Sequence, residues 1–266
     1  MPSHLSSIGF PVERPEDLGE LAEQVGPKAS ALAVKDGTYF RWTGSGGEEL
    51  WLQVNADREL IGINPHFDGQ SRIRVGVTAR VSRKRDSELD GAFHAWASPG
   101  EKPTEGEYPF IFDTPEAASY LDLEVPSIVQ AQITAFAHEL SLFASEEEQA
   151  AAEIGDGLKL AARSFIPSGL FVDKGQEGAE PAAEAILTGQ ILQVELRTNE
   201  LTGKSFWWAI VDTLGGQFDV VVDPVLVERE PVVGGFLSGS FWLSGRLITY
   251  PRKKKSWFGQ LLGGSG

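Results

Sequence analysis

The spacing of the histidines shows whether this sequence could form a metal site, because imidazole is a common metal ligand. The four histidines are His4, His66, His94 and His138. A catalytic zinc ion usually takes three protein ligands and keeps one position open. There is no His-Glu-x-x-His pattern, and the adjacent residues His138 and Glu139 cannot share one face of a helix or a strand. His66 and His94 could meet on neighbouring strands beside a carboxylate. Since ligands are few and poorly spaced, we expect no metal ion and no other cofactor.

A second pattern resembles the end of a phosphate-binding loop. Gly203, Lys204 and Ser205 match the last positions of that motif. Thr198, however, stands where the motif needs its first glycine, and a strand pattern follows where the motif needs a helix. The sequence therefore predicts a hairpin turn here.

Three carboxylates, Asp212, Asp219 and Asp223, fall close together in the sequence. On a strand, Asp219 and Asp223 share one face while Val220 and Val222 point to the other. A calcium site or a general-acid pair would need such a cluster, but the pattern favours the solvated outer face of a barrel, and we expect the latter. The chain has no cysteine, which excludes disulfides, thiolate zinc sites, iron–sulfur clusters and cysteine nucleophiles.

Aromatic residues give the strongest indication of binding. Phe206, Trp207 and Trp208 are consecutive on a predicted strand, so at least one side chain points away from the interior. Trp242 follows Phe241 in the same way on a later strand. Outward aromatics could stack nucleic-acid bases. The formal net charge of −15, from 38 acidic and 23 basic residues, disfavours a phosphate-binding protein. We therefore expect Phe206, Trp207, Trp208 and Trp242 to pack against the first domain or against a partner protein.

Residues 251–266 form a tail with a different composition. Four consecutive cations precede two aromatics: Arg252, Lys253, Lys254, Lys255, Trp257 and Phe258. Leu261 and Leu262 extend the apolar side of a short helical pattern. We predict a mobile tail that binds a protein partner. It could also touch an anionic membrane, where each cation contributes ~1 kcal/mol near the surface, or fold back onto the acidic body of its own chain.

The first 172 residues read as a mixed α+β domain. Alternation and turn residues predict a short strand at 6–12, an amphipathic helix from Pro15 to Val25, and strands near 29–34, 39–42, 50–54, 60–63, 71–81 and 91–97. A surface loop follows at 98–108, then short strands at 109–112 and 120–125 around a helical turn at 115–119. Apolar residues within 128–143 fit both the helical spacing and the alternation of a strand, and we favour a strand. Ser145 and Glu148 predict a capped helix start.

A change in composition predicts a linker at residues 173–184, which are rich in Gly, Glu, Ala and Pro. The remaining pattern is purely β. It predicts strands at 186–198, 204–212 and 217–222 and a final pair within 235–248. The domains are therefore expected at 1–172 and 185–250, with the tail at 251–266.

Two stretches resemble known folds. The sequences TGQILQVELRTNELTGKSFWWAIVDTLGGQFDVVVD and PVVGGFLSGSFWLSGRL are similar to a small OB-like barrel. The order strand, helix and three strands over residues 6–67, with SSIGFPVERPEDL, resembles the βαβββ module of the vicinal-oxygen-chelate (glyoxalase-like) superfamily. That resemblance implies a metal-ligand histidine on the first strand, where this chain has Ser7. The combination also resembles bacterial proteins carrying both parts, which implies no activity.

These observations predict an α+β, mainly β protein: a mixed N-terminal α+β domain followed by an OB-like small β-barrel. We expect a non-enzymatic binding or scaffolding protein that uses the barrel aromatics and the tail for protein contacts. One alternative is a metal-dependent glyoxalase-like enzyme in the N-terminal domain, and another is single-stranded nucleic-acid binding by the barrel. The N-terminus lacks a signal-peptide pattern and no apolar run could span a membrane, so we expect a cytoplasmic protein.

Overall fold

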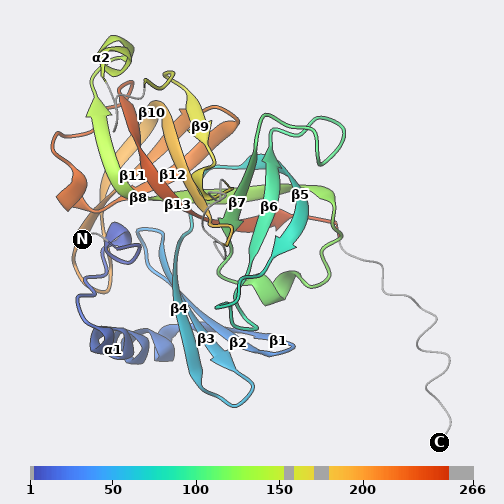
Figure 1. Cartoon of the computed structure of the whole chain (residues 1–266). Coiled ribbons are helices and arrows are strands. Elements are labelled where there is room, and N and C mark those ends of the chain that lie inside the picture. The colour runs from blue at the N-terminus through green and yellow to red at the C-terminus, as the bar shows by residue number, and fades with distance from the viewer. Residues whose placement is uncertain (1–2, 153–158, 171–179, 252–266) are drawn as a thin grey trace, which may run out of the picture.

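The computed structural model describes residues 3–152, 159–170 and 180–251 (Figure 1). The protein is mainly β and contains two sheets, one of four strands and one of nine. In Figure 1 the four-stranded sheet and the helix α1 lie below the nine-stranded sheet. The mainly β class predicted from the sequence is therefore confirmed.

The N-terminal segment differs from the prediction. Residues 6–12 form no strand; the chain turns through the 3-10 helix η1 (Ser6–Ile8) instead. Ser3 and Ser6 explain this difference, because their side chains bond to nearby backbone groups: Ser3 Oγ accepts from the Ser6 amide at 3.1 Å, and Ser6 Oγ from the Ser3 amide at 2.8 Å. The strand that should open a βαβββ module is thus missing.

The helix and the first sheet follow the sequence pattern closely. The helix α1 (Pro15–Val25) begins at a proline, and Asp17 accepts from the Arg14 amide at 2.9 Å. It continues into η2 (Gly26–Lys28). The four-stranded sheet is an antiparallel meander of β1 (Ser30–Val34), β2 (Gly37–Thr43), β3 (Glu48–Asn55) and β4 (Leu60–Phe67).

The nine-stranded sheet uses residues from most of the remaining chain. Its strands are β5 (Ile73–Val81), β6 (Ala92–Ala97), β7 (Pro109–Asp113), β8 (Ser127–Phe143), β9 (Ser164–Ile166), β10 (Glu184–Thr198), β11 (Ser205–Thr213), β12 (Gly216–Val222) and β13 (Phe236–Thr249). The short helices are η3 (Ala117–Tyr120), α2 (Glu146–Ala151), η4 (Ser168–Leu170) and η5 (Pro224–Leu226). Residues 128–141 belong to one strand, as favoured, and Ser145 caps α2 by accepting from the Glu148 amide.

Two predicted elements of this sheet are wrong. Residues 120–125 form turns and no strand, since the Leu123 amide bonds back to the Tyr120 carbonyl. Residues 235–248 form the single strand β13 where we expected a pair. At Gly239, within this strand, a Cβ would come within 2.0 Å of the Glu139 carbonyl oxygen on β8. The glycine therefore serves a close approach of two strands.

The strands β8 and β13 connect the two halves of the sequence. They pair antiparallel from Phe236 opposite Phe143 to Thr249 opposite Gln130. β8 also pairs with β12, and β12, β11, β10 and β13 pair in turn, so that these five strands form a ring of pairings. Because β8 precedes the predicted linker, residues 185–250 do not complete this ring alone. The OB-like barrel is not confirmed, and the domain boundary at 173–184 stays a prediction.

One buried cluster lies between the four-stranded sheet and β11–β12. It combines Ile8, Phe10 and the apolar side of α1 with Phe67, Phe206 and Trp208. A larger buried cluster is formed mainly by residues of the nine-stranded sheet. Within the described residues, every helix is too short or too polar to cross a membrane.

Candidate protein-binding surface

The three consecutive aromatics on β11 divide between two faces of the strand, as strand geometry requires. Phe206 and Trp208 are fully buried. Their rings pack near Phe67 of the four-stranded sheet, at centroid distances of 6.1 and 6.3 Å. Trp207 points to the opposite face and is half-buried. Of the three residues, Trp207 alone is placed to meet a partner.

Trp208 is held by a buried carboxylate. Its indole Nε1 donates to Asp219 at 2.8 Å. Asp219 is fully buried and also accepts from the Ser71 hydroxyl, the Ser71 and Gln70 amides and the Gln132 side chain. The expectation of a solvated Asp219 is therefore wrong. These donors come from the segment before β5 and from β8, so a pattern local to β12 could not reveal them.

Trp242 is also held by contacts within the chain. Its ring stacks on His4 with centroids 4.1 Å apart, and its Nε1 donates to Asp113 at 2.7 Å. His4 in turn lies 2.7 Å from His138, Nε2 to Nε2. Burial and the neighbouring His138 lower the pKa of His4 to about 4. Trp242 therefore anchors the N-terminal segment to β13.

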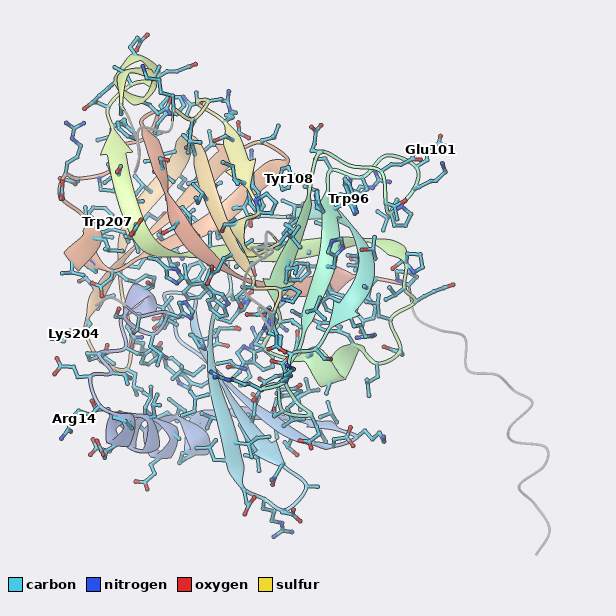
Figure 2. The ribbon with its side chains drawn as sticks, in the orientation of Figure 1. Arg14, Trp96, Glu101, Tyr108, Lys204 and Trp207 are labelled. Carbon is cyan, nitrogen blue, oxygen red and sulfur yellow. The ribbon has the colours of Figure 1, made fainter. Side chains whose placement is uncertain are left out.

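A groove lined mostly by apolar residues lies around Trp207, on the side of β11 that also carries the buried Ala209 and Val211. Leu196 of β10 pairs directly with Trp207 and is 55% exposed. The groove measures about 580 Å³, and its lining residues are Val194, Glu195, Leu196, Trp207, Pro224, Val227, Glu230 and Pro231. We call this surface the Trp207 face. Figure 2 shows Trp207 at the left side of the molecule, whereas Glu101 lies at its right side.

The segments that border the Trp207 face add further exposed apolar side chains. Val225 in η5 is 74% exposed, and Val232 and Val233 are 49% and 66% exposed. Isolated apolar residues on a surface need no explanation, but a contiguous group beside a groove marks an interaction site. Aromatic residues such as Trp207 are enriched among the residues that dominate binding energy.

The edge of the Trp207 face is acidic. Glu230 lines the groove and Glu228 lies beside Val227; both are exposed, and neither forms an ion pair with a described residue. Glu195 is paired with Arg197 at 2.9 Å, and hydrogen bonds from Gln193 and Arg197 lower its pKa. This face is therefore apolar at its centre and negative at its edge.

The remaining predicted site residues are not brought together. His66 on β4 is fully buried, with Nδ1 2.9 Å from Ser244 Oγ and Nε2 3.1 Å from Gln132 Oε1. His94 on β6 bonds to Thr78 at 2.6 Å instead. Among the described residues no group of three histidine, aspartate or glutamate side chains could hold a metal ion.

The other sequence motifs have structural roles or lie elsewhere. Residues 199–204 form the predicted hairpin turn, with the Asn199 amide donating to the Lys204 carbonyl at 2.8 Å. Asp223 caps η5 by accepting from the Val225 amide. The tail residues Arg252, Lys253, Lys254, Lys255, Trp257 and Phe258 lie outside the described residues.

The apolar neighbours of Trp207 were not predicted from the sequence. Val194 and Leu196 alternate with polar residues along β10, and this alternation was the available signal. It did not show which side would stay open, because that depends on what covers the sheet.

No family model, curated protein or solved structure matches this chain. The function proposed below therefore depends on the geometry of the chain itself.

Proposed function

We propose that this protein is a non-enzymatic binding or scaffolding protein, whose Trp207 face binds an apolar, basic segment of a protein chain. The observation that supports this proposal is the apolar groove with Glu230 at its edge. Such a surface favours a segment with aromatic or aliphatic anchors, which fill the groove, and cations, which meet the acidic edge.

The tail of a second copy of this chain is the occupant we propose. Trp257 and Phe258 supply aromatic anchors, and Arg252 to Lys255 supply four positive charges. The whole chain carries a formal charge of −15, so a cationic tail is attracted to the acidic body of another molecule.

Strand geometry favours a second copy over the same molecule. Phe236, at the start of β13, pairs with Gln190, and Leu196 lies six residues further along β10. β13 then runs 14 residues in the opposite direction, ~46 Å if straight. From Pro251 to Trp257, six residues span at most ~22 Å even when fully extended. Trp257 therefore reaches the Trp207 face of another molecule more readily than its own.

Contacts of this kind join unlike surfaces. A tail that binds the face of the next molecule makes a heterologous, head-to-tail interface, which leads to a ring or an open chain of molecules. Self-association should therefore grow with concentration and should weaken at high salt, since the cations lie at the edge of the interface.

Complementary variants of the full chain test this proposal. Leu196→Asp damages the face but keeps the tail, and a Lys254→Glu, Trp257→Ser double variant damages the tail but keeps the face. Each variant alone should stay monomeric in sedimentation velocity, whereas the wild-type chain should associate. A mixture of the two variants should form one-to-one complexes and nothing larger, because each pair then has one intact face and one intact tail.

Leu121→Asp is the matched control, because Leu121 is 53% exposed against 55% for Leu196. It should associate like the wild-type chain. Association that survives Leu196→Asp would overturn the proposal. So would a tail variant that loses only binding to vesicles of anionic lipid, which would assign the tail to a membrane.

A further inference from the structure

A separate cavity lies where the two sheets meet, and the Trp207 face plays no part in it. The cavity has a volume of about 200 Å³. Four elements line it: β4, the loop between β5 and β6, the end of β7, and β13. The lining residues are Asn64, Pro65, Arg83, Asp86, Asp90, Gly91, Asp113, Thr114, Pro115, Trp242 and Ser244.

The cavity carries more negative than positive charge. Arg83 is its one basic lining residue, and it pairs with Asp113 at 2.7 Å. Asp86 and Asp90 form no ion pair with any residue that the structure describes. Two carboxylates therefore face this cavity without a balancing cation.

The hydrogen bonds of these two carboxylates differ. Both oxygens of Asp90 are used, since they accept from Gln53, Asn64 and both the amide and the hydroxyl of Ser87. Asp86 accepts from the Arg83 amide through Oδ2 at 2.7 Å, and its Oδ1 has no hydrogen bond to a described residue. Asp86 thus retains an oxygen for a donor inside the cavity.

Thr114 gives an independent indication of a ligand. It lines the cavity and is only 3% exposed, yet its Oγ1 has no hydrogen-bond partner among the described residues. A buried hydroxyl without a partner is costly, about 1–3 kcal/mol. Thr114 and Asp86 thus both line the cavity, and each has an oxygen without a hydrogen bond to a described residue.

The size of the cavity limits what can enter. About 200 Å³ is below the roughly 300–1,000 Å³ of pockets that hold drug-sized molecules, while a water molecule needs ~30 Å³. Nucleotides and peptides are therefore too large. We propose that this cavity binds a small organic cation with a primary ammonium group, which donates to Asp86 Oδ1 and to Thr114 Oγ1.

Binding of 1,4-diaminobutane to the full chain, measured by calorimetry at physiological salt, tests this site. The neutral compound 1,4-butanediol has a similar size and is the ligand control. We expect the diamine to bind and the diol not to bind. Both Asp86→Asn and Thr114→Val should weaken binding at least about tenfold, which corresponds to 1.4 kcal/mol.

Asp57→Asn, on an exposed turn, is the protein control for general attraction to an acidic surface, and it should bind the diamine like the wild-type chain. Thr114→Val keeps the shape of the side chain, so its fold can be checked by an unchanged melting temperature without ligand. The proposal is overturned if the diol binds equally well, if a calcium salt displaces the diamine at the same concentration, or if Thr114→Val and Asp86→Asn bind normally.

Discussion

Trp207 and Trp208 are neighbours in sequence and have opposite surroundings. Trp208 is fully buried, donates to Asp219 and lies under the Arg197 guanidinium at 3.8 Å from the ring centroid. Trp207 is half-buried in a groove whose main neighbour, Leu196, is 55% exposed. The N-terminal segment, α1 and the four-stranded sheet cover the Trp208 side of β11. On the other side Ala209 and Val211 are buried in the larger cluster, and Trp207 packs against that cluster only in part. The same residue type therefore stabilises the fold on one side and is available for binding on the other.

The largest effect on stability should come from removing the elements that cover Phe206 and Trp208. Residues 185–250 expressed alone would lack β8 and the whole four-stranded sheet, so Phe206 and Trp208 would face water. We expect this fragment to show no cooperative thermal unfolding by circular dichroism, while the full chain unfolds cooperatively. A fragment with a sharp transition would show that residues 185–250 form an independent domain, as the sequence predicted.

Asp219→Ala should have the next largest effect. This substitution leaves the Trp208 indole and the Ser71 and Gln70 amides without their acceptor in a buried site. Loss of one partner in a buried charged network costs about 3–5 kcal/mol. Urea unfolding should report this loss. Asp223→Ala is the control, since Asp223 accepts one exposed backbone amide, and it should cost about 1 kcal/mol.

The sequence predicted most elements because their signals are local. The helix α1 follows from Pro15 and an apolar spacing of three and four, and the β2 start follows from Asp36-Gly37. The failures at residues 6–12 and 120–125 have local causes too, namely hydrogen bonds from serine side chains and from a turn. Short apolar runs alone did not distinguish these turns from strands.

The site was harder to predict because it depends on contacts between distant residues. Strand geometry puts Asp219 and Asp223 on one face, which suggests a solvated face, but the donors Ser71 and Gln132 lie about 90 to 150 positions before Asp219 in the chain. The cavity at the junction likewise combines Asn64, Asp86, Thr114 and Trp242 from four elements. Alternation gives the face of each side chain, and tertiary contacts decide which face is covered.

Acid should destabilise the fold in part through His4. Burial and the neighbouring His138 lower the pKa of His4 from 6.5 to about 4, so the unfolded chain binds a proton at a pH where the folded chain does not. Stability from this group is present above pH 6.5 and is lost as the pH falls towards 4. Between pH 7 and 5 the loss should be about 2 kcal/mol.

Urea unfolding of His4→Asn at both pH values checks this expectation. His94→Asn serves for comparison, since burial also lowers the pKa of His94, which lies on another strand. The pH-dependent loss should be smaller in His4→Asn than in the wild-type chain. An unchanged loss would mean that His4 is accessible to protons in the folded state. His4 would then be less buried than in this structure.

The smallest effect on stability is expected for Trp207→Ala. Part of the Trp207 ring already meets water, so its removal loses apolar contact with Leu196 and Val194 and leaves no buried polar group unsatisfied. We expect a cost of about 1 kcal/mol in urea unfolding, well below that of Asp219→Ala. Self-association should nevertheless be lost, because a central aromatic residue contributes more to an interface than to the isolated fold. A cost of several kcal/mol with association intact would reverse the comparison: Trp207 would then be a core residue, and the open face would need another binding residue.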